Sequence, residues 1–346
     1  MMKIAQVAPL LVPVPPTEYG GTERIVHTLT QELVALGHDV TLFAAAGSRT
    51  DAELHSSSPA PIWQAGGDAL AWHAMEVEEL VNRSAEFDVI HSHLDVLPWL
   101  AGDRYRAPLV TTLHGRIDLP ETRKLLHEFK GWPLVSISDA QRKPVLDLDL
   151  NWIATVYHGL DLEHMYSGGK GDGGYLAFVS RMAPEKGPQI AIKTAIEAGM
   201  KIKVAGPVPD EEKEWFEKQV KPMLDHELVE WVGELDDKGK NEVVGAATAF
   251  LVPIQWDEPF GLAFIEALAT GTPLVSMARG SLPELIENGR HGFLVDDESK
   301  LVEACKKAAS LDRAECRRWV LERYSPRRMA DGYLSVYGRL LEKRAA

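Results

Sequence analysis

The sequence lacks several features that would place it in a specialised class of proteins. Only two of its 346 residues are cysteines, Cys305 and Cys316, which excludes a disulfide framework and leads us to expect a reducing compartment, by default the cytoplasm. Its apolar runs are shorter than the roughly 18 residues that suggest a membrane span. What remains is an ordinary globular protein whose length predicts two domains.

The chain also lacks an excess of basic residues, since its formal net charge is −14. Residues 1–165 hold 12 Lys and Arg against 22 Asp and Glu, a balance of −10, and the remainder holds 25 against 29, a balance of −4. Nucleic acid binding requires a basic surface, so we expect no nucleic acid partner. The acidic first half also disfavours stable association with an anionic membrane. The oligomeric state stays open.

Apolar segments typical of strands alternate with segments of helical periodicity along the whole chain. This alternation predicts an α/β fold with two doubly wound, Rossmann-like domains and a C-terminal helical tail. In the first half, strands are expected at residues 4–8, 39–44, 89–92, 109–114, 134–138 and 153–157. In the second half, they are expected at residues 175–180, 201–205, 229–232, 249–253, 273–277 and 292–295.

A glycine-rich segment with few apolar side chains separates the two strand series. It predicts an N-terminal domain at 1–165, a linker at 166–174, a second domain at 175–325, and a helix at 326–346 that could return to the first domain. The linker glycines Gly169, Gly171 and Gly174 match a dinucleotide-binding pattern. That pattern must follow a strand and open a helix, whereas this segment precedes a strand, so we expect no dinucleotide cofactor.

The densest polar constellation follows the strand expected at 249–253. Glu258 lies just before a helix expected at 260–269, and Glu266 lies two turns into that helix. Open α/β sheets bind ligands at the carboxyl ends of their strands, where a carboxylate accepts hydroxyl hydrogen bonds and helix amides favour phosphate. This combination suits a sugar joined to a phosphate. For an isolated pair of glutamates, a helix cap and a solvent-facing side chain remain the alternative.

Two further features, one loop after a strand and one helix start, could bind an anion. Arg181 and Lys186 flank the loop after the strand expected at 175–180, and together they could neutralise a diphosphate without a metal ion. Gly20 and Gly21 open the first long helix, where missing side chains let backbone amides approach an anion. A surface basic pair and a plain turn are the alternatives at these two places.

Histidines end two of the strands expected in the first half of the chain. His114 ends the strand expected at 109–114, where it can donate a hydrogen bond to a substrate oxygen. A histidine whose hydrogen bonds are satisfied locally by the loop is the alternative. His91 and His93 end another strand, but no companion ligand pair with metal-site spacing accompanies them, so we expect no metal site. Asp147 and Asp149 match a D-x-D metal pattern, which we interpret as a solvated loop.

These residues together resemble the retaining glycosyltransferases of family 4, which have the GT-B fold. Residues 258–266 have the form E-P-F-G-x-x-x-x-E, the E-x7-E element of that family. Residues 181–187 resemble its G-R-x-x-x-E-K-G segment, although Val179-Ser180 replaces the glycine before Arg181. Residues 157–161 resemble the element before its interdomain linker. Gly20-Gly21, His114-Gly115 and Gly206 also stand where the family has equivalent residues. The resemblance covers nearly the whole chain in the same order.

The resemblance implies a deep cleft between the two domains and a role for each matching residue. Arg181 and Lys186 would hold the diphosphate in place of a metal ion, and His114 would contact the donor sugar. Gly20 and Gly21 would close over the phosphates or the acceptor. Glu258 would bind the hydroxyls of the donor sugar, and Glu266 would bind the ribose hydroxyls. The remaining nucleotide-sugar-binding positions would be Gly206 and the backbone amides of Phe260, Gly261 and Leu262.

The implied activity is transfer of a hexose from a nucleoside diphosphate sugar, with UDP favoured, to the hydroxyl of a small soluble or saccharide acceptor. The implied mechanism is metal-independent front-face displacement with retention, with no cofactor beyond the donor. The alternatives are a phosphorylase, a nucleotide-sugar epimerase, a non-catalytic nucleotide-sugar-binding protein and, most distant, an oxidoreductase.

Overall fold

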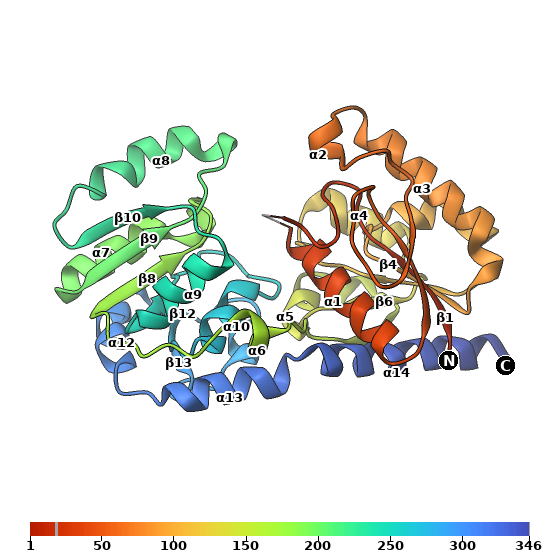
Figure 1. Ribbon diagram of the computed structural model, residues 1–346. Coiled ribbons are helices and arrows are strands. Elements are labelled where there is room, and N and C mark those ends of the chain that lie inside the picture. The colour runs from red at the N-terminus through yellow and green to blue at the C-terminus, as the bar shows by residue number, and fades with distance from the viewer. Residues whose placement is uncertain (18–19, 346) are drawn as a thin grey trace. The chain divides into compact units, whose positions relative to one another are not determined.

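A computed structural model describes residues 1–17 and 20–345, and they form two compact units (Figure 1). Unit 1 comprises Met1–Leu160 together with Tyr324–Ala346, and unit 2 comprises Asp161–Arg323. Each unit is built on its own parallel β-sheet covered by helices on both faces. The two doubly wound domains predicted from the sequence are therefore confirmed.

The sheet of unit 1 has seven strands in the order β3-β2-β1-β4-β5-β6-β7, all parallel. The chain moves outward from β1 to β3 and then returns to β4, so the strand order reverses between β1 and β4. Ligands in open α/β sheets bind at the carboxyl ends of strands at such a reversal. The strands are β1 (Lys3–Val7), β2 (Asp39–Phe43), β3 (Glu53–His55), β4 (Val89–Ser92), β5 (Leu109–Thr112), β6 (Leu134–Ser136) and β7 (Trp152–Thr155).

Side-chain alternation divides this sheet into two unlike faces. One face packs an apolar cluster that includes Val7, Ile90 and Leu109 against Leu80 of α3 and the buried Trp99. The opposite face packs against α1 and α14, which contact each other. The helices of unit 1 are α1 (Gly21–Ala35), α2 (Ile62–Ala65), α3 (Ala69–Arg83), α4 (Pro120–Glu128), α5 (Asp139–Arg142) and α14 (Pro326–Ala345), with short 3-10 turns at Ser84–Glu86, Leu97–Arg104 and Lys143–Leu148.

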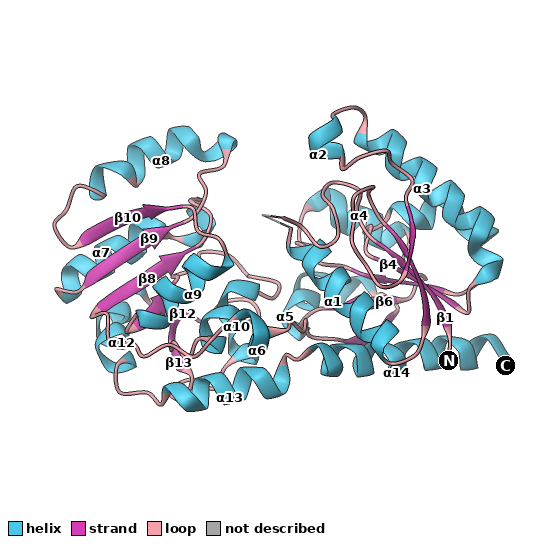
Figure 2. Cartoon of the chain, viewed as in Figure 1, coloured by secondary structure: helices cyan, strands magenta, loops and turns pink. Residues whose placement is uncertain are grey.

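The sheet of unit 2 has six parallel strands in the order β10-β9-β8-β11-β12-β13, and its order reverses between β8 and β11. Helices α7 and α12 contact each other on one face, while α9 and α10 contact each other on the other face (Figure 2). The strands are β8 (Tyr175–Val179), β9 (Lys201–Ala205), β10 (Val229–Gly233), β11 (Ala249–Leu251), β12 (Leu274–Met277) and β13 (Gly292–Val295). The helices are α6 (Leu162–Met165), α7 (Pro188–Ala198), α8 (Lys213–Gln219), α9 (Asp237–Ala246), α10 (Leu262–Ala269), α11 (Leu282–Leu285), α12 (Leu301–Ala308) and α13 (Arg313–Arg323), with 3-10 turns at Pro184–Lys186, Asp210–Glu212, Lys221–Met223 and Glu298–Lys300.

Local chemistry sets several of the helix ends. The Asp68 carboxylate accepts hydrogen bonds from the amides of Leu70 and Ala71 at the start of α3. Gly199 ends α7 with a φ of +67°, a left-handed conformation that side-chain-bearing residues adopt at a cost. Such caps satisfy backbone groups that a helix leaves unpaired at its termini.

The glycine-rich segment 166–174, expected to be a linker, lies within unit 2. The Gly169 amide donates to the Thr270 carbonyl, and the Arg313 guanidinium donates to the carbonyls of Gly169, Gly245 and Ala247. A Cβ at Gly169 would lie 2.0 Å from the Gly245 carbonyl oxygen. The glycines therefore permit close packing, and the chain passes between units at 160–161 and 323–324 instead.

Two smaller differences also have physical causes. Strand β3 was not expected, because it has only three residues, is mostly exposed and shows no apolar alternation. The helix expected at 260–269 begins at Leu262, because Gly261 has a φ of +87° and cannot belong to a helix. No helix among the described residues is long and apolar enough to span a membrane.

Candidate functional site

The predicted site residues of unit 2 gather on loops that leave the carboxyl ends of β8, β9 and β11. Arg181 follows β8, Gly206 follows β9, and Glu258 follows β11. Strands β8 and β11 are the two between which the strand order reverses. The parallel sheet thus carries these loops to its ligand-binding edge.

Lys186 and Glu258 form an ion pair although 72 positions separate them in the chain. The Lys186 Nζ lies 2.5 Å from Glu258 Oε2, and the two side chains are only 14% and 11% exposed. The same ammonium lies 5.0 Å from the centre of the Trp256 ring, a cation–π distance. A carboxylate and a cation, both largely buried, therefore lie in contact at the carboxyl end of the sheet.

Arg181 completes a second, more exposed pair beside the first. Its guanidinium lies 3.0 Å from the Glu185 carboxylate, and both side chains are about one third exposed, at 34% and 30%. An ion pair this accessible contributes little to stability. The Arg181 guanidinium is thus available to exchange Glu185 for an anionic ligand at small cost.

Two glycines let the loops that carry these pairs pack tightly. Gly187 has a φ of +70°, and a Cβ there would lie 2.5 Å from the Pro253 carbonyl oxygen. The Gln255 amide donates to the Glu185 carbonyl at 2.7 Å. Gly206 has a φ of +139°, and a Cβ there would lie 1.8 Å from the Ser180 carbonyl oxygen. The loops after β8, β9 and β11 therefore form one packed edge.

The backbone of Glu258 is fixed by the segment that follows β12. The Ser281 amide donates to the Glu258 carbonyl at 2.9 Å, and the Ser281 hydroxyl donates to the Phe260 carbonyl at 2.7 Å. Gly280, with a φ of +55°, packs so closely that a Cβ would lie 2.3 Å from the Glu258 carbonyl oxygen. These contacts hold the predicted backbone positions Phe260, Gly261 and Leu262 at the start of α10.

Glu266 is partly buried on the second turn of α10. The sequence places Glu266 two turns into a helix that begins at residue 260, but because α10 begins only at Leu262, Glu266 lies on its second turn. The turn at Gly261 separates the two carboxylates into a loop residue and a helix residue. Their proposed contacts to sugar and ribose remain predictions.

The remaining predicted residues, Gly20, Gly21 and His114, belong to unit 1, so the site as predicted is divided between the units. Gly21 is the first residue of α1, and a Cβ at Gly20 would lie 2.7 Å from Pro16 Cβ. Residues 18 and 19, which precede the glycines, lie outside the described part of the chain.

His114 lies two residues beyond the end of β5, not within the strand as expected. Its ring stacks on the His158 ring at 5.1 Å and 15°, and its Nε2 lies 2.8 Å from His93 Nδ1. Burial lowers the pKa of His114 to about 3 and the pKa of His93 well below its usual value. Both imidazoles are therefore neutral at physiological pH.

Among residues 1–17 and 20–345, no group of three or more His, Cys, Asp or Glu side chains is arranged to hold a metal ion. The clustered histidines instead form hydrogen bonds to one another and to neighbouring polar groups. In the D-x-D segment, Asp147 pairs with Arg123 at 2.7 Å.

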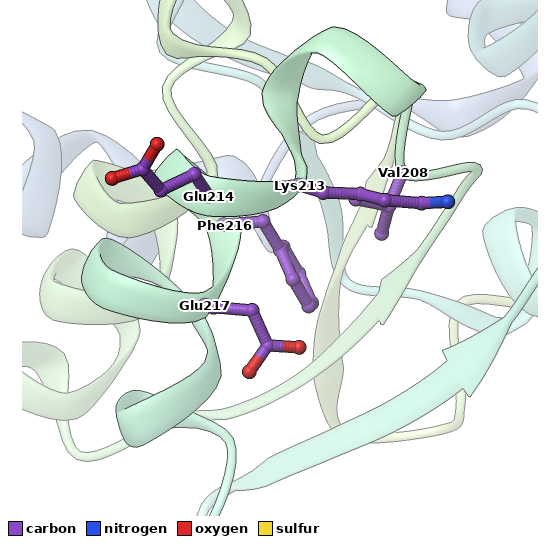
Figure 3. A pocket seen from close by; sticks show the side chains of 5 residues that line it. All are labelled: Val208, Lys213, Glu214, Phe216 and Glu217. Atoms are coloured by element: carbon purple, nitrogen blue, oxygen red, sulfur yellow. The ribbon is translucent and has the colours of Figure 1, made fainter.

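One open pocket lies elsewhere on unit 2, beside helix α8 (Figure 3). Val208, Lys213, Glu214, Phe216 and Glu217 line it, and none of them is a predicted site residue. The Lys213 ammonium is engaged by Asp210 at 2.6 Å. The pocket brings together none of the polar groups that the sequence singled out.

Sequence reasoning missed Trp256, Gln6 and the connection of His93 to His114. Trp256 stands two residues before Glu258, and its only signal was an aromatic ring in a polar loop. Gln6, His93 and His114 had a clearer signal, because alternate positions on neighbouring strands face the same side of a sheet.

Two family models match the chain. Residues 164–322 match the model described as glycosyl transferases group 1, which covers almost all of unit 2. Residues 19–164 match the model described as glycosyltransferase family 4. The two matches meet at residue 164, close to the first passage between units.

Curated proteins and solved structures give the same result. The chain is 28% identical over 331 residues to a glycogen synthase of Mycobacterium tuberculosis, covering 80% of this chain and 79% of that protein. It is 29% identical over 338 residues to a D-inositol 3-phosphate glycosyltransferase of Frankia alni, covering 80% and 82%. The structure of Anabaena HepE in complex with UDP and glucose matches with a TM-score of 0.73 at 18% identity, covering 98% and 100%, which shows a shared fold.

Proposed function

Because the chain belongs to the glycosyltransferases of group 1 and family 4, which have the GT-B fold, we propose that it transfers a hexose from a UDP-sugar to an acceptor hydroxyl with retention of configuration. The observation that carries this proposal is the largely buried ion pair of Lys186 and Glu258 at the strand-order reversal of unit 2. It offers a cation for a leaving phosphate and a carboxylate for sugar hydroxyls at one place.

The proposed chemistry is a front-face displacement that needs no metal ion. The bond between the sugar C1 and the β-phosphate oxygen breaks, and a bond from C1 to the acceptor oxygen forms on the same face. The acceptor proton passes to a phosphate oxygen of the leaving diphosphate. Lys186 and Arg181 stabilise the charge that develops on this leaving group, and a preorganised donor of this kind is worth about 3 kcal/mol in the transition state.

The donor assignment is supported by the HepE structure of the same fold, which holds UDP and glucose. In the proposed complex, Glu258 accepts hydrogen bonds from sugar hydroxyls, and Glu266 accepts hydrogen bonds from the ribose hydroxyls. The acceptor is a small soluble or saccharide hydroxyl compound, consistent with the acidic N-terminal half and with the sugar and inositol phosphate names of the curated relatives.

Thermal unfolding with added nucleotides tests the donor site. UDP, GDP, ADP and their glucose, mannose and galactose derivatives are added in the presence of a chelator. A ligand at a hundred times its dissociation constant adds about 2.7 kcal/mol of stability. We expect the UDP series to stabilise the wild type but not Lys186→Met.

Lys203→Met is the matched control, because Lys203 also pairs with a carboxylate, Glu230 at 3.2 Å, and lies 4.9 Å from the Tyr175 ring. It is expected to bind UDP like the wild type. Stabilisation by no nucleotide would overturn the proposed donor site.

Retention is tested with UDP-α-glucose in the absence of an acceptor. Proton NMR identifies the anomer of glucose that is released first when the enzyme hydrolyses this donor. α-Glucose as the first product supports retention, and β-glucose contradicts it. A requirement for inorganic phosphate would instead indicate a phosphorylase. Conversion of the donor sugar into its epimer without acceptor would indicate an epimerase.

A further inference from the structure

Three adjacent strands of unit 1 present polar side chains to one face of their sheet. Gln6 on β1 and His91 on β4 are register partners, and His93 and His114 follow β4 and β5 on the same face. The C-terminal helix α14 packs on this face and adds the hydroxyl of Tyr337. Buried polar groups must satisfy one another there, because the core offers little water.

A continuous hydrogen-bonded chain runs from Gln6 to His114. Gln6 Oε1 lies 2.9 Å from His93 Nε2, and His93 Nδ1 lies 2.8 Å from His114 Nε2. Gln6 and His93 are 0% and 2% exposed. The buried Nδ1 atom of His114 is the end of the chain and has no hydrogen-bond partner among the described residues.

The orientation of the Gln6 amide, with Nε2 toward Tyr337 and Oε1 toward His93, sets the direction of these hydrogen bonds. An amide oxygen only accepts, so His93 Nε2 must carry a hydrogen and donate it to Gln6 Oε1. A neutral imidazole has one donor and one acceptor, so His93 Nδ1 must accept. His114 Nε2 then carries the hydrogen and donates it to His93. His114 Nδ1 is left as a bare acceptor.

The other half of the network agrees with this direction. Gln6 Nε2 donates to the Tyr337 hydroxyl at 3.0 Å, which leaves that hydroxyl hydrogen for His91 Nδ1 at 2.8 Å. His91 Nε2 then donates to the Thr112 hydroxyl at 2.8 Å, and Thr112 donates to the Tyr333 hydroxyl at 3.1 Å. In this arrangement every contact joins one donor to one acceptor.

We propose that Gln6 and His93 are positioning residues that hold His114 in its Nε2–H tautomer, so that Nδ1 accepts a hydrogen bond from a hydroxyl of the bound sugar. This rests on the proposed function, and it reverses the donor role that the sequence suggested for His114. It also makes His114 a specificity determinant. A sugar with a hydroxyl at this position satisfies Nδ1, whereas a deoxy or fluoro sugar leaves it unpaired and binds about tenfold more weakly.

Long-range proton–nitrogen correlation NMR of the ¹⁵N-histidine-labelled wild-type protein tests the tautomer without any ligand. We expect a protonated Nε2 and an unprotonated Nδ1 for His114 at pH 7, assigned by comparison with His114→Asn. A protonated Nδ1 in the wild type would overturn the proposal. Because no substrate is added, this result is independent of whether UDP-sugars prove to be the donors.

Two variants test the positioning residues. In Gln6→Met the acceptor for His93 is lost, and in His93→Phe the partner of His114 is lost. In both, the His114 signals should shift to a mixture of tautomers. Tyr333→Phe is the matched control, since it removes a hydroxyl from the same buried network but leaves the bonds between Gln6, His93 and His114 in place.

Activity with a panel of monodeoxy UDP-sugars supplies the second readout. Gln6→Met and His93→Phe should lower kcat/KM about tenfold for the parent sugar and little for the one deoxy sugar that lacks the recognised hydroxyl. Tyr333→Phe should affect both sugars equally. Equal losses for every sugar in all three variants would indicate a merely structural network and overturn the proposal.

Discussion

Both units have a parallel sheet with one reversal of strand order, yet they hold their candidate site residues by opposite physical means. In unit 2, charged groups form ion pairs, between two loops for Lys186 and Glu258 and within one loop for Arg181 and Glu185. In unit 1, the groups around His114 are neutral and joined by directed hydrogen bonds within the sheet and to α14.

This difference matches what each site is proposed to do. A leaving diphosphate needs positive charge that is present before the reaction begins. A sugar hydroxyl needs an acceptor of known direction and no net charge. In unit 2, loops bring side chains that are distant in the sequence together. In unit 1, His93 and His114 directly follow two paired strands, and their hydrogen bonds to each other and to Gln6 of β1 fix their orientation.

The largest difference between the units is expected at low pH, which should reduce the stability of unit 1 more than that of unit 2. Burial lowers the pKa of His91, His93 and His158 well below the usual value and that of His114 to about 3. An unfolded histidine takes up its proton near pH 6.5. The unfolded state therefore binds more protons below that pH, so stability that is full above pH 6.5 is lost as the pH falls toward the folded values.

The loss approaches about 1.4 kcal/mol per pH unit for each such histidine. Glu76 offsets part of it, because burial raises its pKa and its folded form keeps a proton. Unit 2 contributes His291, whose pKa burial lowers to about 4. Hydrogen exchange at pH 7 and pH 5 should show unit 1 losing more protection than unit 2, and equal losses would contradict this account.

Removing the cation of unit 2 should affect the reaction more than the fold. Lys186→Met should lower kcat by about 10²- to 10³-fold, because the leaving phosphate loses a preorganised donor. Steady-state kinetics measure this, and Lys203→Met should stay close to wild type. The double variant Lys186→Met/Glu258→Gln should regain stability but not kcat, which would separate the structural role of the ion pair from its role in the reaction. Equal kcat values for the two lysine variants would refute the role of Lys186.

Adding a methyl group against the Glu258 backbone should destabilise unit 2. In Gly280→Ala the new methyl group meets the Glu258 backbone and strains a φ of +55°, so we expect a loss of about 3 kcal/mol. Gly199→Ala is the control, because Gly199 has a φ of +67° with no atom within 4 Å of a Cβ. Strain alone should cost about 1 kcal/mol there. Denaturant unfolding compares the two, and equal costs would show that the contact with Glu258 is unimportant.

The smallest effect is expected at Glu266. Glu266→Gln removes a charged acceptor for the ribose hydroxyls and should raise the KM for the donor about tenfold, with little change in kcat. The exposed Glu322→Gln serves as the control for loss of one carboxylate from unit 2. A fall in kcat with unchanged KM would place Glu266 in the chemical step instead.

Much of the fold was predictable because parallel strands buried on both faces leave continuous apolar runs in the sequence. The strand expected at 201–205 matches β9 residue for residue. Strand β3 was missed because it is short and mostly exposed, and the helix expected at 260–269 starts late because the φ of Gly261 is not visible in a letter code. The segment 166–174 was taken for a linker because sequence shows a lack of apolar side chains but not the carbonyls that Arg313 binds.

The candidate site residues were found by their position after strands, but their partners were not. The sequence by itself determined two α/β units and the polar groups at their strand ends, because hydrophobic periodicity is a local property. Only the tertiary structure decided that Lys186 meets Glu258 across 72 positions and that Gln6 meets Tyr337 across 331. Such contacts depend on strand order and on the return of α14 to unit 1, since packing chooses partners by distance in space and not along the chain.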